Sequence, residues 1–105
     1  MGKIDNFEFW QLTEAVLLWT GWGKEAWPRR DDSLLVNHFG PELAAKLLPA
    51  IKSLEDDFYS SDARFVAADL QEMAKISAEQ FRKKHPGIAE EIVKAFAWCY
   101  TFDFK

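Results

Sequence analysis

Apolar residues recur at every third or fourth position along most of the chain, which is the spacing of amphipathic helices. Alternation of apolar and polar residues, the pattern typical of strands, is confined to the last few positions. The spacing predicts five helices, at about Phe7–Thr20, Ser33–Phe39, Pro41–Ser60, Ala63–His85 and Ile88–Tyr100. We therefore expect an all-α bundle.

Residues typical of helix ends flank these segments. Side chains that can accept hydrogen bonds from the free N–H groups of a helix N-terminus precede three of them: Asp5 or Asn6, Asp31 or Asp32, and Asp62. Glycines typical of helix ends follow two of them, as Gly21 with Gly23 and as Gly40. Pro49 lies inside the third segment on its polar side, which favours a kink over a break.

The apolar positions predict which faces turn inward. The first helix is apolar nearly all round, which indicates a central buried helix that carries Trp10 and Trp19 in the core. The inward stripes of the later helices are Leu43, Leu47, Ile51, Leu54 and Phe58; Val66, Leu70, Met73, Ser77 and Phe81; and Ile92, Phe96 and Cys99. The segment 100–105 alternates aromatic and polar residues, so we expect a short extended strap laid on the bundle.

Composition and charge narrow the class of protein. A chain of 105 residues with 49% hydrophobic residues predicts one domain, residues 1–105. The net charge of −4 disfavours nucleic acid as a direct partner, because phosphate binding needs a basic face, and favours a basic protein partner. Neither a signal-peptide core nor a membrane-spanning apolar run is present, so we expect a cytoplasmic protein without membrane contact.

The sequence contains no recognisable catalytic motif. His38 and His85 have no metal-ligand partners at the usual spacing, and Cys99 projects into an apolar stripe as a buried structural residue. A nucleophile elbow and a phosphate-binding glycine loop are both missing. We therefore expect no enzyme, no cofactor and no metal site. A small enzyme stays as an alternative, which would require one of the histidines beside a carboxylate in a pocket.

Carboxylates are concentrated between positions 55 and 72. Six of the chain's 17 acidic residues lie there: Glu55, Asp56, Asp57, Asp62, Asp69 and Glu72. The first three fall in the last turns of the third helix, where the helix dipole favours cations, and such a departure from local preference marks a candidate functional site. The alternatives are that the helix ends early and water solvates these acids, or that they serve the start of the fourth helix.

Aromatic and apolar residues on expected outer faces extend this candidate site. Phe65, Asp69, Glu72 and Ile76 follow helical spacing on the outer face of the fourth helix, unless another element covers them. Tyr59 is expected as a second apolar anchor beside Phe65. Trp22 and Trp27 lie in a loop, and Trp98 lies outside its stripe, so these three either contact a partner or fill open parts of the bundle.

Acidic and aromatic residues are interleaved in one stretch: the carboxylate run Glu55-Asp56-Asp57, the acids Asp62, Asp69 and Glu72, and the aromatics Phe58, Tyr59 and Phe65. In these residues the chain resembles the bacterial immunity proteins of contact-dependent growth inhibition and related polymorphic toxin systems. This resemblance implies an inhibitor that binds a cognate toxin, often a nuclease, in the cytoplasm of the producing cell and occludes its active site. Carboxylates would pair with the Lys and Arg side chains that the nuclease uses for phosphates. The alternative is a helical adaptor or regulatory subunit that self-associates, and the oligomeric state stays open.

Overall fold

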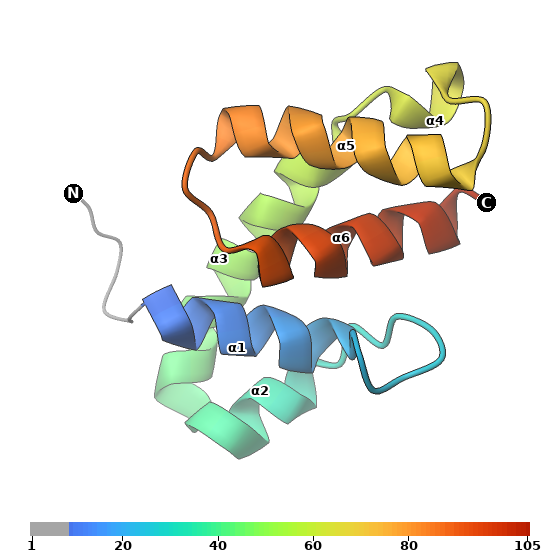
Figure 1. Cartoon of the computed structure of the whole chain (residues 1–105). Helices are drawn as coiled ribbons and strands as arrows, with labels where there is room; N and C mark the ends of the chain where they lie inside the picture. The colour runs from blue at the N-terminus through green and yellow to red at the C-terminus, as the bar shows by residue number, and fades with distance from the viewer. Residues whose placement is uncertain (1–8) are drawn as a thin grey trace.

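Residues 9–105, the part of the chain that the computed structural model describes, contain six helical segments joined by loops (Figure 1). They are α1 (Phe9–Thr20), α2 (Asp32–Phe39), α3 (Pro41–Tyr59), α4 (Ala63–Val66), α5 (Leu70–Lys84) and α6 (Glu90–Asp103). These residues contain no strand, so the predicted all-α class is confirmed. The cap expected at Asp5 or Asn6 lies outside the described residues. Within them, no helix combines the length and apolar character that crossing a membrane requires.

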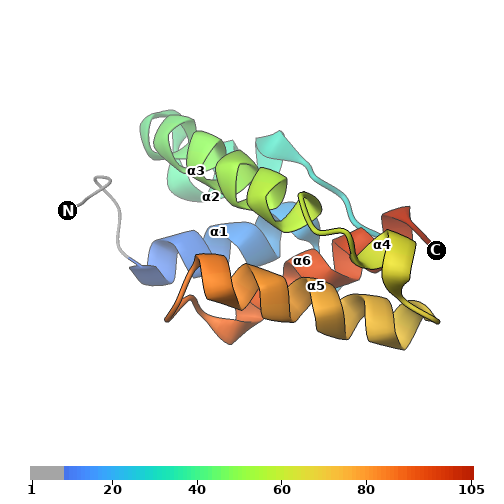
Figure 2. The same cartoon turned by 90° about the horizontal axis from the view of Figure 1, so that it is seen from above.

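The helices pack in two layers. α1, α6 and α5 lie side by side with α6 in the middle, and α3 crosses behind them (Figures 1 and 2). α3 contacts all three helices of the front layer, and α2 packs on α3 and α1. The principal extents of 42 × 33 × 17 Å show that the molecule is flat. A flat molecule of this size exposes a large share of its side chains, which bears on the surfaces described below.

Local chemistry sets the first helix boundaries where the sequence predicts them. Gly21 adopts a φ of +84°, and its N–H donates to the Leu17 carbonyl at 2.9 Å, which closes the end of α1. Asp31 caps α2 by accepting from the Ser33 N–H at 3.0 Å. Pro49 sits on the exposed side of α3, which continues through it.

The predicted fourth helix is wrong, because the chain divides it into α4 and α5. Ala67 is extended, and Asp69 begins a new helix by accepting from the Glu72 N–H at 2.8 Å. Glu72 in turn accepts from the Ala68 N–H at 2.6 Å, so the two carboxylates hold the start of α5 from both sides. Asp62 makes no side-chain cap hydrogen bond at α4.

This division changes the inward stripe of the segment. Met73, Ser77 and Phe81 are buried as expected, whereas Val66 and Leu70 are 61% and 44% exposed. The helical spacing that would have turned both inward is interrupted at Ala67. Two apolar side chains expected in the core therefore lie on the surface.

The C-terminal strap expected from the alternating aromatics is also wrong. α6 continues to Asp103, and the Phe104 N–H donates to the Tyr100 carbonyl at 3.0 Å. Tyr100 and Phe104 then lie one turn apart with their ring centroids 4.9 Å apart, and both pack near Tyr59. The aromatic residues at the chain end satisfy helical spacing as well as alternation, and packing favours the helix.

An aromatic cluster forms the centre of the core. Phe58, Phe81, Phe96 and Tyr100 are each at most 1% exposed, with ring centroids 5.0–6.1 Å apart in the pairs that touch. Trp19 is buried as predicted, and its indole N–H donates to Asp32 at 2.8 Å. Trp10 is 62% exposed, so its predicted place in the core is wrong: α1 lies at the edge of its layer, not at the centre.

Candidate functional site

The acids at the end of α3 differ in their contacts. Glu55 accepts from the Arg30 Nε at 2.6 Å, and an Asp57 carboxylate oxygen lies 2.8 Å from His85 Nε2. Asp56 is exposed, and its side chain makes no hydrogen bond or ion pair with the described residues. Two of the three acids at the C-terminal end of α3, where the helix dipole disfavours negative charge, therefore have a basic side chain within hydrogen-bond distance. Asp56 alone of the three is uncompensated within the described residues.

The three later acids also have internal contacts, but they remain exposed. Asp62 accepts from the Gln80 amide at 3.0 Å, and Asp69 and Glu72 cap α5. Each of these contacts uses one carboxylate oxygen, so the other oxygen of each group makes no hydrogen bond with the described residues. The cap at Asp69 has a sequence signature, an Asp followed three residues later by Glu, which lies inside the periodic apolar pattern.

Tyr59 is tied into the fold through its hydroxyl. It donates to the Asp103 carboxylate at 2.6 Å and accepts from the Arg30 Nη2 at 2.7 Å. Burial, followed by the hydrogen bond to Asp103, raises the pKa of Tyr59 above its ordinary value. Its side chain is half-buried and packs on Tyr100 and Phe104, so its main contacts are internal.

Arg30 is the centre of this polar network. Its φ of +52° is the one positive value at a non-glycine position in residues 9–105, and its guanidinium also donates to Asp103 at 2.8 Å. Burial lowers the pKa of Arg30, but the hydrogen bond to Glu55 and nearby negative charge outweigh burial, so the net pKa is raised. Arg30 thereby joins the loop after α1 to α3 and α6.

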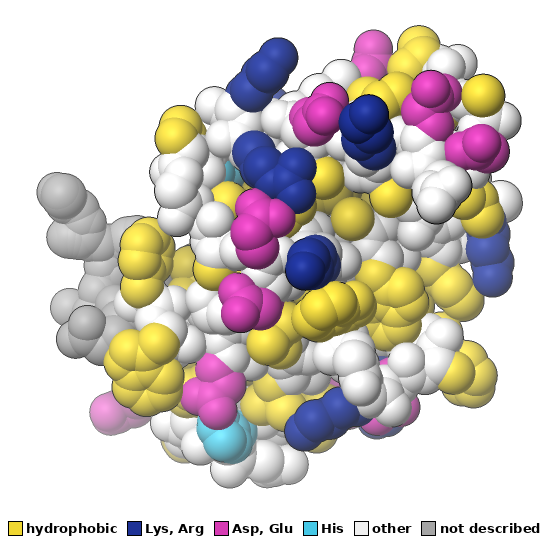
Figure 3. All heavy atoms as spheres, viewed as in Figure 1, with side chains coloured by type: hydrophobic (Ala, Val, Ile, Leu, Met, Phe, Trp, Pro, Cys, Tyr) yellow, Lys and Arg dark blue, Asp and Glu magenta, His cyan; other side chains and the backbone are white. Residues whose placement is uncertain are grey.

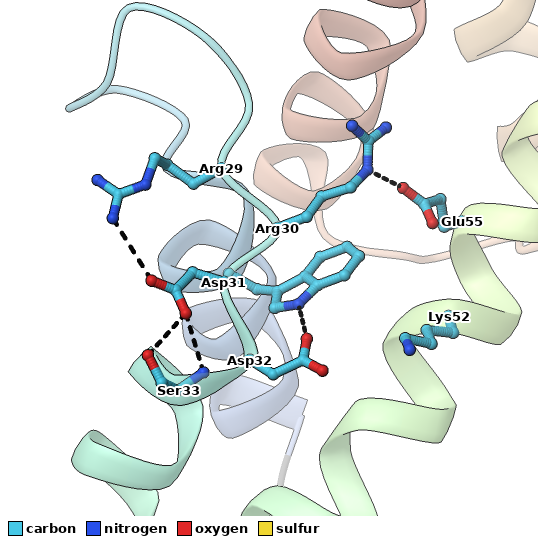
Figure 4. Close-up of a pocket in the computed structure, with 8 residues that line it drawn as sticks. Arg29, Arg30, Asp31, Asp32, Ser33, Lys52 and Glu55 are labelled. Atoms are coloured by element: carbon cyan, nitrogen blue, oxygen red, sulfur yellow. Dashed lines mark hydrogen bonds and ion pairs between the residues drawn. The ribbon is translucent and has the colours of Figure 1, made fainter.

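A shallow basin of about 660 Å³ lies beside Arg30 (Figure 4). Figure 4 shows Lys52 extending from α3 beside Asp32 and Glu55, while Arg29 points away toward Asp31. The hydrogen bonds from the Ser33 side chain and backbone lower the pKa of Asp31. Cations and carboxylates balance across the basin, so no anion site follows.

The expected outer face of the fourth helix is wrong in its geometry. Phe65 belongs to α4 and is 75% exposed, whereas Ile76 belongs to α5 and is half-buried against the core. Phe65 is exposed together with Val66 and Leu70, which the broken helix also leaves on the surface. We call these three residues the α4 corner. Over α4 and the start of α5, Figure 3 shows hydrophobic side chains beside acidic ones.

The loop tryptophans have different surroundings. Trp22 is half-buried against the core and lines a groove of about 460 Å³ with Leu17, Leu18 and Leu34. Trp27 is 60% exposed. Trp22 therefore fills an open part of the bundle, while Trp27 lies on the surface. Trp98 is half-buried on α6.

Both histidines have carboxylate neighbours that their sequence positions do not reveal. His38 lies 3.3 Å from Glu14 at the rim of the groove that Trp22 lines, and His85 pairs with Asp57. His38 and Glu14 both line that groove, which is the arrangement that the alternative of a small enzyme requires, so this alternative stays open. Among the described residues, no hydroxyl or thiol is hydrogen-bonded to either histidine.

The end of α3 holds a serine and a lysine near His85. The Lys84 ammonium contacts the Ser60 hydroxyl and donates to the Asp57 carbonyl at 3.2 Å, and the Ser60 hydroxyl donates to the same carbonyl at 2.7 Å. These bonds satisfy free carbonyl groups at a helix C-terminus, which is a structural role. Within residues 9–105, no three metal-ligating side chains lie together.

Comparison with known proteins gives no relative from which a function could be carried over. The chain matches no family model, no curated protein and no solved structure. Its most distinctive features are the α4 corner and the acids around it, of which the sequence pattern identified Phe65, Asp69 and Glu72 but not Val66 or Leu70.

Proposed function

We propose that this protein is a binding protein that inhibits a basic protein partner by covering its surface with the α4 corner. The observation that carries the proposal is the exposure of Phe65, at 75%, beside Val66 and Leu70 at 61% and 44%. Three large apolar side chains exposed within six positions form the kind of patch that marks protein interfaces. Burying an exposed Phe side chain is worth about 1.5–3 kcal/mol.

Charge around the corner supports a basic partner. Asp62, Asp69 and Glu72 are exposed within the same stretch, and Asp56 carries a carboxylate without an internal partner. Acids at the rim of an interface speed association with a basic surface and select against acidic partners. The apolar corner would supply most of the affinity, since exposed ion pairs contribute little.

The resemblance to immunity proteins supplies the partner class. A toxin nuclease carries Lys and Arg for phosphate binding, and the free carboxylate oxygens at the rim would pair with such groups. Inhibition would then need no chemistry from this chain. The corner and its acids would exclude the nucleic acid substrate by occupying its binding surface.

The test compares two exposed aromatic residues in a pull-down from the native lysate. Phe65→Ala should lose a protein that the wild type captures, whereas Phe9→Ala, at an equally exposed phenylalanine on α1, should retain it. The captured protein should be basic and its toxicity should be suppressed by the wild type. Equal capture by Phe65→Ala, or an acidic partner, would overturn the proposal.

A second candidate is self-association through α1. Phe9 and Trp10 are 77% and 62% exposed on adjacent positions, which favours an adaptor or regulatory subunit that pairs with its own copy. Sedimentation equilibrium distinguishes the two candidates. A dimer that Trp10→Ser dissociates and Phe65→Ser leaves intact would favour this second candidate.

A further inference from the structure

The Arg64 side chain contacts two exposed phenylalanine rings that lie far apart in the sequence. Its guanidinium carbon is 4.5 Å from the ring centroid of Phe65 on α4 and 4.5 Å from that of Phe104 at the end of α6. Each distance is well within the range of a cation–π contact. The two rings are 39 positions apart in the sequence, and Arg64 joins them into one surface feature.

Buried groups fix the guanidinium from behind. Nη1 donates to the backbone carbonyls of Tyr59 and Ser61 at 3.3 and 3.1 Å and lies 3.3 Å from the Tyr100 hydroxyl. That hydroxyl donates to the Ser61 carbonyl at 2.9 Å and accepts from the Arg64 backbone N–H at 3.1 Å, while Tyr100 itself is fully buried. The arginine therefore cannot move without breaking contacts to the core.

The partners of Arg64 are unusual for a surface arginine. It forms no ion pair with any carboxylate in the described residues, although acids are abundant nearby. Its guanidinium instead donates to carbonyl oxygens and lies over both rings. Only arginine among the cationic side chains can do both at once, because lysine has no planar fork.

We infer that Arg64 is a positioning residue for docking: it holds Phe65 and Phe104 as a preformed aromatic platform for a partner segment that presents an apolar side chain flanked by Lys or Arg. This inference rests on the proposed function. Phe65 is exposed and Phe104 is 37% exposed, so each ring has an outer surface free for contact. Rings fixed before binding lose less conformational freedom on association, which raises affinity without any new contact.

Charge complementarity determines the flanking residues of that segment. The Arg64 charge is already placed between the two rings, so the apolar group of the partner should meet the outer ring surfaces. Lysine or arginine beside that group would then reach Asp62, Asp69 and Glu72 around the α4 corner. A segment of the opposite charge would meet repulsion from the same acids.

The experiment uses NMR on the full chain labelled with ¹⁵N and with ¹³C in its phenylalanine rings. The probes are a 14-residue amphipathic peptide of Leu and Lys and a peptide in which Glu replaces every Lys. Arg64→Lys is compared with Arg82→Lys, a surface arginine whose partner is Glu90. In the free protein, we expect contacts between the Arg64 side chain and both rings. We expect the Leu/Lys peptide, and not the Leu/Glu peptide, to shift the Phe65 and Phe104 signals.

Arg64→Lys should weaken binding of the Leu/Lys peptide about five- to tenfold, while Arg82→Lys should not. If Arg64→Lys does not fold, Phe104→Leu tests the same point, because it removes one ring and keeps the backbone contacts of Arg64. Unchanged peptide affinity in these variants, or freely moving rings in the wild type, would overturn the positioning role and leave the proposed function standing. A Leu/Lys peptide that binds the wild type away from Phe65, or fails to bind, would overturn the proposed docking surface. The NMR contacts between Arg64 and the two rings in the free protein would then show by themselves whether Arg64 holds the rings.

Discussion

The guanidinium of Arg30 lies 2.8 Å from the carboxylate of Asp103, a residue 73 positions later in the chain. The pair joins the loop after α1 to the last turn of α6, and Tyr59 donates a hydrogen bond to the same carboxylate oxygen. Both charged side chains are about one-third exposed, so solvent screens part of their attraction. The network nevertheless fixes the end of α6, where Phe104 contacts Arg64.

Removing either partner of this pair should destabilise the fold moderately. Arg30→Ala breaks hydrogen bonds to Glu55, Tyr59 and Asp103 and should lower the free energy of unfolding by about 2 kcal/mol. Arg30→Gly loses the same bonds but suits a φ of +52°, so it should recover about 1 kcal/mol of that loss. Urea unfolding of both variants checks the order. An Arg30→Gly variant less stable than Arg30→Ala would contradict the strain at this position.

The two acids that start α5 should behave as structural residues. Asp69→Ala removes the side chain that accepts from the Glu72 N–H and should lower the free energy of unfolding by about 1 kcal/mol. Asp69→Ser keeps an acceptor at the cap and removes the charge, so it should stay within a few tenths of a kcal/mol of the wild type. Thermal melts followed by circular dichroism measure both. If the two variants lose equal stability, the charge matters rather than the cap.

The sequence predicts the helices well because helical periodicity is a local property. All but one of the predicted helices form, and Gly21, Asp31 and Gly40 sit at the boundaries expected of them. The exception shows a competing local signal. The Asp69 and Glu72 cap starts a helix inside an unbroken apolar pattern, and its hydrogen bonds prevail over the continuation of that pattern.

The candidate site is less predictable, because its contacts are long-range. Arg30 meets Glu55, Tyr59 and Asp103 across 25, 29 and 73 positions, so no spacing rule could pair them. Equally, the stack around Arg64 depends on α6 continuing to Asp103, where the sequence pattern predicted a strap. What the sequence did identify is the acidic and aromatic stretch 55–72, since local composition alone reveals it.

Neighbouring acids on α3 should respond differently to charge reversal, although the sequence alone makes them equivalent. Asp57→Lys breaks the contact with His85 and places a cation near Lys84, so we expect a loss of about 1–2 kcal/mol of unfolding free energy. Asp56→Lys removes no internal contact and should change stability by less than about 0.5 kcal/mol. Chemical denaturation checks both values. Asp57→Asn, which keeps an acceptor for His85, is the matched control and should lie close to the wild type.

Cys99 should be unreactive in the folded protein and should make folding sensitive to alkaline pH. Its side chain is fully buried, and burial is the main cause that raises its pKa to about 12, against the opposing charge of Arg30. Because the fold favours the neutral thiol, its contribution to the free energy of unfolding is complete below the ordinary thiol pKa of 9.0 and is lost as the pH rises from there toward 12.

Because the Cys99 thiol is buried, a disulfide reagent at pH 8 should modify it only as fast as the protein opens, and urea should accelerate the reaction. The loss of stability above pH 9 should be smaller in Cys99→Ala, which lacks the ionisable group. Rapid modification of the native protein, or an identical alkaline transition in Cys99→Ala, would show that Cys99 is accessible or that other groups control that transition.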